Sequence, residues 1–339
     1  LPPCLSRKLK AEHRGKGDRM GFPSPERVTT RGADLEVFRA GTAGAPAIIL
    51  CHGWPEHAYS WRNQIAPLAA AGFEVIVPNQ RGFGGSSCPS AVEAYDIEAL
   101  TSDLEDLLLH FGHENAIFVG HDWGALVVWA MAVLKPERVR AVANLSVSYL
   151  RRGPKPWIPF WREMLGPQHY IVHFNDAPGE ADAFLDAHRT NFLRNMYRRA
   201  EAPPSPPEAS DLPPLLAMAQ APTAPGASLM SDEDLAVFDQ AFARTGFTPG
   251  INWYRNFDRN WARLDGVAEH IAVPTLMIWG HYDMVPPPSA LEEIAPDLEV
   301  HGLPCGHWIQ QEAPEETNAL LLSWLKKRDL TSPAPPRPA

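Results

Sequence analysis

The chain is poor in cysteine, and its cysteines form no recognisable pattern. Only four occur in 339 residues, without a Cys-x-x-Cys pair or another zinc-like spacing. Scattered cysteines of this kind are typical of a reducing compartment rather than of a disulfide framework. We therefore expect a cytoplasmic protein that uses no metal. The four residues are Cys4, Cys51, Cys88 and Cys305.

Long apolar runs and a surplus of basic residues are also missing. No apolar stretch approaches the roughly 18 residues that a membrane span needs. The 30 Lys and Arg residues face 40 Asp and Glu residues, which gives a formal net charge of -10. Since nucleic acids and anionic membranes attract clustered basic side chains, we expect neither as a partner. A small neutral substrate suits this net charge better than a nucleic acid or a membrane does. The sequence is also compatible with a homodimer.

Neither end of the chain shows the pattern of a folded segment. Residues 1–19 are basic and polar and contain no apolar segment, so they do not form a secretory signal as they stand. We expect the natural start at Met20 with a disordered extension before it, and a native basic arm is the alternative. Repeated proline in residues 329–339 predicts a disordered tail, because proline cannot join a helix or an inner strand.

Between these ends, apolar strand-like runs alternate with amphipathic helix-like segments. The alternation predicts the α/β class, with a mainly parallel central sheet flanked by helices. Strands are expected at 47–53, 74–79, 116–121, 139–147, 274–280 and 298–303. Helices are expected near 60–71, 96–111, 123–135, 287–295 and 314–327.

Residues 150–260 interrupt this alternation. They are rich in Arg, Trp and Pro, and they contain the stretch EAPPSPPEASDLPP between more helical pieces. We interpret them as an inserted, mostly helical cap domain. The α/β core is then built from residues 20–149 and 261–328.

The stretch Gly120-His121-Asp122-Trp123-Gly124 lies between an apolar strand and an apolar helix. This context is that of the nucleophile turn of serine hydrolases, with Asp122 where the serine would be. The glycines allow a sharp turn and close packing of the helix, so that side chain 122 projects from the carboxyl edge of the sheet. The alternative is a plain helix N-cap, which is a common use of aspartate.

A second loop, His52-Gly53-Trp54-Pro55, also follows a predicted strand. The backbone N–H of Trp54 would point at a reacting carbonyl oxygen. Together with the N–H of Trp123 it would form an oxyanion hole with two donors. The alternative is that Gly53 and Pro55 only shape a turn.

Two later loops present an acid and a base. Asp283 follows the predicted strand 274–280 in the sequence GHYDMV, and His307 follows the strand 298–303 in GHWIQQEAPEE. The chain order is therefore Asp122 as nucleophile, Asp283 as acid and His307 as base. This is the order that α/β-hydrolases use, with each residue just past the end of a strand.

With these motifs and the RGFGGSS loop that begins at Arg81, the chain resembles the α/β-hydrolase-fold epoxide hydrolases from about residue 22 to 328. Residues 245–261, TGFTPGINWYRNFDRNW, are similar to the cap segment that supplies a tyrosine above the nucleophile, here Tyr254. Residues 168–183, QHYIVHFNDAPGEADA, are similar to the stretch that supplies a second tyrosine, here Tyr170, but contain one residue more than the family pattern.

The resemblance implies a set of functional residues. Asp122, Asp283 and His307 would form the triad, and Tyr170 and Tyr254 would bind the epoxide oxygen. Trp54 and Trp123 would supply the oxyanion hole. The substrate pocket for an apolar or aryl epoxide would include His52, Pro55 and Trp253.

The chemistry gives an independent reason for tyrosines. An epoxide has a poor alkoxide leaving group, so ring opening near neutral pH needs a proton donor at the ring oxygen, and a phenol is protonated at that pH. Asp122 would form an ester with the opened ring, and water activated by His307 would hydrolyse it to a vicinal diol without cofactor or metal. A departing halide needs no proton, so the tyrosines disfavour a haloalkane or haloacid dehalogenase with the same nucleophile. A ligand receptor without catalysis is the third alternative, and the complete triad disfavours it.

Overall fold

The computed structural model describes residues 22–203 and 212–332. The predicted N-terminal extension, residues 1–19, lies outside the described residues, as do residues 333–339 of the predicted tail and the centre of the proline-rich stretch. Leu330, at the start of that tail, is buried, and its N–H donates to the carbonyl of Leu325 at 3.0 Å.

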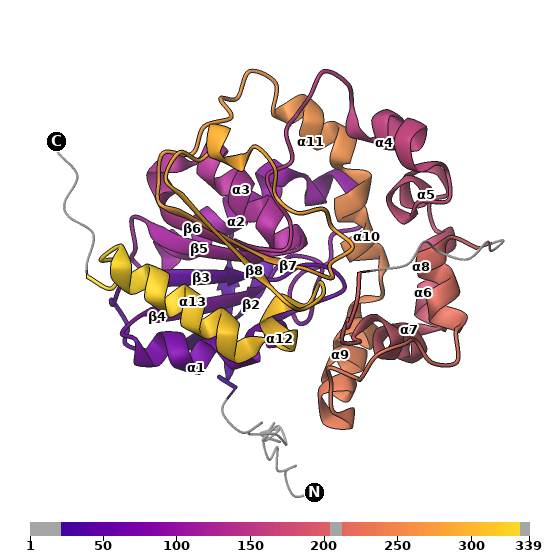
Figure 1. The fold of residues 1–339 in the computed structure, drawn as a ribbon, viewed down its shortest axis with the longest axis horizontal. Helices are drawn as coiled ribbons and strands as arrows, with labels where there is room; N and C mark the ends of the chain where they lie inside the picture. Colours follow the sequence, from indigo (N-terminus) through magenta and orange to yellow (C-terminus); the bar gives the residue numbers. More distant parts are fainter. Residues whose placement is uncertain (1–21, 204–211, 333–339) are drawn as a thin grey trace, which may run out of the picture.

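One eight-stranded sheet forms the centre of the described protein, in the order β1-β2-β4-β3-β5-β6-β7-β8 (Figure 1). The strands from β3 to β8 pair in parallel, and β1 and β2 form an antiparallel hairpin that continues the sheet beside β4. Their bounds are β1 Pro25–Thr29, β2 Asp34–Ala40, β3 Ala47–Cys51, β4 Glu74–Asn79, β5 Ala116–His121, β6 Val139–Leu145, β7 Thr275–Gly280 and β8 Leu298–Leu303.

The inner strands are apolar throughout because helices cover both faces of the sheet. Successive residues of β3 point to opposite faces: Ile48 and Leu50 belong to one buried cluster, and Ile49 and Cys51 belong to the other. The first face packs against α1 (Arg62–Ala70) and α13 (Pro314–Lys327), and the second packs against α2 (Ile97–His110) and α3 (Trp123–Leu134). The sheet therefore holds its carboxyl-end loops on a rigid two-sided core.

The six predicted strands are confirmed, each within two residues, and so are the helices α1, α2, α3 and α13. The prediction of a helix near 287–295 is wrong, because only a 3-10 turn, Leu291–Glu293, forms there. Three prolines at 286–288 remove backbone donors, and Ala290 has a φ of 51°, so a continuous helix cannot form. Strands β1 and β2 were not predicted, because their residues are mostly exposed or partly buried and mix charged with apolar side chains.

A mostly helical cap is inserted between β6 and β7, as expected. The described residues between these two strands form helices joined by loops, with one isolated bridge between Arg198 and Ser228. Figure 1 shows most of these helices beside the sheet, on the side where α10 reaches toward it. They are α4 Trp157–Leu165, α5 Tyr170–Asp176, α6 Glu180–Ala187, α7 Arg189–Met196, α8 Pro214–Gln220, α9 Asp232–Thr245, α10 Thr248–Arg255 and α11 Phe257–Arg263.

Helix length and composition also bear on membrane insertion. Within residues 22–203 and 212–332, no helix is both long enough and apolar enough to cross a bilayer.

Candidate active site

Asp122 lies at the sharp turn between β5 and α3. Its backbone has a φ of 52° and a ψ of -121°, a conformation that residues other than glycine rarely adopt. The neighbouring glycines are required by space, because a Cβ at Gly120 would lie 2.4 Å from the carbonyl oxygen of Gly124, and one at Gly124 would lie 2.0 Å from that of Cys51. The Asp122 side chain makes no capping hydrogen bond to α3, which removes the plain N-cap alternative.

The loop after β3 approaches the same carboxylate. The backbone N–H of Trp54 donates to Oδ1 of Asp122 at 2.7 Å, and a Cβ at Gly53 would lie 2.4 Å from the same oxygen. The Trp54–Pro55 peptide bond is cis. Trp123 is the first residue of α3, so its N–H is one of the helix-terminal donors that no helical carbonyl satisfies. Both predicted donors therefore belong to backbone next to Asp122.

The three residues that the sequence suggests as a triad lie close together. His307 follows β8, and its Nε2 lies 3.6 Å from Oδ2 of Asp122. The Nδ1 of His307 lies 2.9 Å from Oδ1 of Asp283, which follows β7. The imidazole therefore lies between the two carboxylates, with Nδ1 toward Asp283 and Nε2 toward Asp122.

The two carboxylates control the protonation of His307. Burial alone would lower the pKa of His307, but the charges of Asp283 and Asp122 raise it well above its usual value. Burial would raise the pKa of Asp283, yet the charge and the hydrogen bond of His307 keep it below its usual value. Asp283 and Asp122 together therefore favour the protonated form of His307.

The two predicted tyrosines reach this site from the cap. Tyr170 begins α5 and Tyr254 lies in α10, and their ring centroids are 5.7 Å apart. Burial and the nearby negative charge of Asp122 raise the pKa of both phenols, so both are protonated at neutral pH. Both phenols line the same cavity as Asp122, so both can donate a hydrogen bond to a group bound there.

A cavity of about 540 Å³ joins these side chains. Asp122, His307, Tyr170 and Tyr254 all line it. Among the described residues, no group of three or more His, Cys, Asp or Glu side chains is arranged to hold a metal ion. Other lining residues from core and cap include Trp54, Pro55, Met196, Leu215, Met218, Met284, Val285 and Trp308.

Two of the residues predicted for the substrate pocket lie elsewhere. His52 is fully buried behind the loop, where its Nε2 accepts a hydrogen bond from the N–H of Gln80 and burial lowers its pKa to about 4. Trp253 is fully buried too, and its Nε1–H donates to the carbonyl of Arg81 at 3.3 Å. Neither residue is among those that line the cavity, and the ring nitrogens of both bind core backbone. Of the three predictions, the structure places only Pro55 in the lining.

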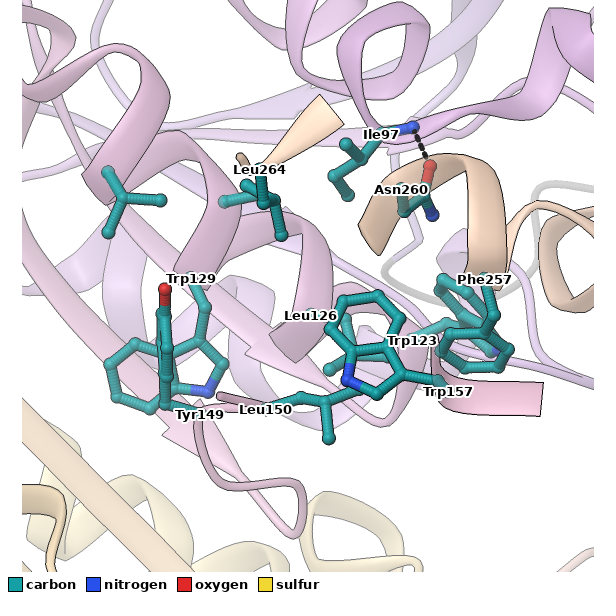
Figure 2. Close-up of a pocket in the computed structure, with 12 residues that line it drawn as sticks. Ile97, Trp123, Leu126, Trp129, Tyr149, Leu150, Trp157, Phe257, Asn260 and Leu264 are labelled. Carbon is teal, nitrogen blue, oxygen red and sulfur yellow. Dashed lines mark hydrogen bonds between the residues drawn. The ribbon is translucent and has the colours of Figure 1, made fainter. Parts of the chain in front are cut away.

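A separate, apolar pocket lies between α3 and the cap (Figure 2). It holds only about 40 Å³, and Figure 2 shows Trp123, Trp157 and Phe257 at one end of it. The Trp123 ring packs on Phe257 with centroids 4.7 Å apart and edge-on to Tyr254 at 5.1 Å. The side chain of Trp123 thus anchors the cap, while its backbone begins the helix next to Asp122.

The sequence did not single out two polar residues at the site. Glu56 is fully buried, and its Oε2 lies 2.7 Å from Nδ1 of His121 and accepts the N–H of Gly53 at 2.8 Å. Burial would raise the pKa of Glu56, but the charge of His121 lowers it to about 2. Ser146 contacts both Asp283 and His307. Glu56 directly follows the His-Gly-Trp-Pro motif, which could have indicated it, whereas Ser146 carries no such signal.

The chain is similar to known proteins over most of its length. A family model described as the alpha/beta hydrolase fold matches residues 46–314. Epoxide hydrolase A of Mycobacterium tuberculosis (strain H37Rv) is 43% identical over 335 residues, which cover 92% of this chain and 100% of that protein. The chain belongs to the epoxide hydrolase family of the α/β-hydrolase fold.

Other members of the epoxide hydrolase family are similar as well. Bifunctional epoxide hydrolase 2 of Sus scrofa is 37% identical over 303 residues, which cover 87% of this chain and 54% of the relative. The crystal structure of Epoxide Hydrolase A from Mycobacterium thermoresistibile has a TM-score of 0.81 at 41% identity, with 90% of this chain and 98% of that chain covered. An epoxide hydrolase from an endophytic Streptomyces has a TM-score of 0.78 at 32% identity, covering 91% and 96%.

Proposed function

We propose that this protein hydrolyses an epoxide to a vicinal diol through an ester on Asp122. The observation that carries the proposal is that Asp122, Tyr170 and Tyr254 line one cavity, with the buried phenols protonated above the carboxylate. A nucleophile and two proton donors on one cavity are what ring opening requires.

The first half-reaction forms the ester. The Asp122 carboxylate attacks one ring carbon, the C–O bond to the ring oxygen breaks, and Tyr170 or Tyr254 delivers a proton to that oxygen as it becomes a hydroxyl. Two donors stabilise the developing alkoxide better than one, because its negative charge is shared between them. The charge of Asp122 disappears in this step.

The second half-reaction breaks the ester. With Asp122 neutralised, one of the two negative charges that raise the pKa of His307 is gone. Nε2 can therefore release its proton, which returns to the tyrosinate left by ring opening, and His307 can then act as a base. His307 then takes a proton from water, which attacks the carbonyl carbon of Asp122. The N–H groups of Trp54 and Trp123 stabilise the resulting oxyanion. Collapse breaks the ester C–O bond, and His307 gives its proton to the departing alkoxide, which releases the diol. The proton of the Asp122 carboxyl group then passes to His307 and restores the carboxylate.

The cavity lining favours an apolar or aryl epoxide as substrate. Aromatic and thioether surface lies beside the polar catalytic groups, from Trp54, Trp308, Met196 and Met218.

We infer a cytoplasmic enzyme from the sparse cysteines. A homodimer stays compatible with the sequence and is not needed to complete the site, because every catalytic group comes from one chain.

A product and label experiment tests this proposal. Styrene oxide and a haloalkane are offered in oxygen-18 water under single-turnover conditions, and diol, halide and the mass of the Asp122 peptide are measured. We expect diol from the epoxide, no halide, and the label in Asp122. Halide without diol would instead assign a dehalogenase, and label found in the diol with unlabelled Asp122 would mean direct attack by water.

A further inference from the structure

Ser146 occupies a fixed position directly after β6. It is buried, and its backbone has a φ of 70°, which is unusual for a residue with a side chain. Its N–H donates to the carbonyl of Ile278 in β7 at 2.9 Å. Since β7 leads into the loop of Asp283, the backbone of Ser146 is held by the strand that presents the acid.

The Ser146 hydroxyl contacts two members of the triad. Its Oγ lies 2.6 Å from Oδ2 of Asp283 and 2.9 Å from Nδ1 of His307. A carboxylate only accepts, so the hydroxyl donates its single hydrogen to Oδ2. Its lone pairs then face Nδ1, which must carry a hydrogen for its contacts with Ser146 and with Oδ1 of Asp283.

This arrangement fixes which nitrogen of His307 faces the nucleophile. Oδ1 of Asp283 also accepts the N–H of Val285 at 2.9 Å, so both carboxylate oxygens are held by donors besides the imidazole. With Nδ1 bound on this side, Nε2 is the nitrogen directed at Asp122. The orientation matters only when His307 must take a proton from water, because the attack of Asp122 on an epoxide does not use the histidine.

We propose that Ser146 is a positioning residue that locks Asp283 and His307 for ester hydrolysis and leaves alkylation of Asp122 unaffected. The inference rests on the proposed two-step function. Ser146 is not among the residues that line the cavity, and its hydroxyl contacts Asp283 and His307, so it acts through the acid and the base.

Two variants of Ser146 separate the hydroxyl from the backbone. Ser146→Ala removes the hydroxyl at the same strained φ, and Ser146→Gly removes it while relaxing the backbone. Ser148→Ala, two residues along the chain and partly exposed, is the matched control. Stopped-flow tryptophan fluorescence with styrene oxide measures alkylation and hydrolysis as separate phases in single turnovers.

We expect hydrolysis to slow about tenfold in both Ser146 variants, the size of one charge-assisted hydrogen bond, with alkylation within about twofold of the parent. The Ser148→Ala variant should match the parent in both phases. Unchanged hydrolysis in Ser146→Ala, equal slowing of both phases, or recovery of the rate in Ser146→Gly would each overturn the proposal.

A spectroscopic measurement keeps this test independent of the epoxide reaction. The downfield proton resonance of the His307 Nδ1–H, assigned by its loss in His307→Gln, is recorded without substrate. It should move or broaden in both Ser146 variants and stay unchanged in Ser148→Ala. An unchanged resonance in Ser146→Ala would refute the positioning role, even if the parent enzyme forms no ester. A parent enzyme that shows no two kinetic phases would refute only the ester route.

Discussion

At the scale of single residues, the site depends on which groups hold charge and which hold protons. Asp122 and Asp283 are negative, the cap phenols are neutral, and His307 lies between the two carboxylates. Burial and neighbouring charge shift the pKa values of Asp283, His307 and the two phenols. Two predictions concern individual side chains of this set.

The first prediction concerns Tyr254. Replacing it by phenylalanine removes one of two proton donors at the ring oxygen, so alkylation should slow about 100-fold while ester hydrolysis stays within about twofold. Rapid-mixing fluorescence with styrene oxide measures both steps. Tyr149→Phe, which alters a phenol outside the catalytic cavity, should leave both steps unchanged. Equal slowing of both steps in Tyr254→Phe would remove its role as proton donor.

The second prediction concerns the proton on His307. Asp122→Asn deletes one of the negative charges that raise the pKa of His307, so this pKa should fall toward its ordinary value of about 6.5. A nitrogen-15 NMR titration of labelled histidine measures it. The same fall is expected when the ester forms, which makes hydrolysis begin only after alkylation. A pKa of His307 that stays the same or rises in Asp122→Asn would contradict this coupling.

At the scale of elements, loops at the carboxyl ends of β3, β5, β7 and β8 present the catalytic groups. The sheet fixes the spacing of these loops. The close packing of α3 against β3 fixes the position of Asp122 relative to the loop after β3. Gly124 makes that closeness feasible, because its Cα faces the carbonyl of Cys51 with no room for a methyl group.

The third prediction follows from this packing. Gly124→Ala should lower the free energy of unfolding by more than about 2 kcal/mol, since α3 must move away from β3. Gly44→Ala is the control, because Gly44 has a φ of 79° but open space around it, and only the backbone strain of about 1 kcal/mol applies. Urea denaturation compares the two variants, and a loss in Gly124→Ala no larger than in Gly44→Ala would contradict the argument.

Elements also show how far the sequence alone predicts this structure. The inner strands were predictable because burial on both faces requires continuous apolar runs, and the positions of Asp122 and Asp283 were predictable because each follows such a run. The hairpin of β1 and β2 was not, since its exposed or partly buried strands mix charged with apolar residues and lack that pattern. The burial of His52 and the contacts of Ser146 depend on side-chain directions across distant loops, which local sequence does not specify.

At the scale of the whole molecule, one segment of the cap holds two loops of the core. Tyr197, just after α7, donates its hydroxyl hydrogen to the carbonyl of Pro55 at 2.9 Å, and the Nε1–H of Trp308 donates to the carbonyl of Met196 at 2.8 Å. The cap is thereby tied to the oxyanion loop and to the loop of His307.

The fourth prediction tests this tie between cap and core. Tyr197→Phe leaves the Pro55 carbonyl without its partner in a buried place, so the free energy of unfolding should fall by about 1 to 2 kcal/mol. The KM for styrene oxide should rise, because the cap side of the cavity loosens. Denaturant unfolding and steady-state kinetics measure both quantities, and an unchanged stability together with an unchanged KM would show that the hydrogen bond does not couple the two parts.

The proposed ester on Asp122 can be trapped by removing the base that hydrolyses it. His307→Gln keeps the nucleophile and both tyrosines but removes the base, so the ester should form and persist. After styrene oxide is added, mass spectrometry should find the peptide that contains Asp122 heavier by one substrate, and unmodified in the Asp122→Asn control. A folded His307→Gln variant that binds the epoxide yet leaves this peptide unmodified would contradict the account.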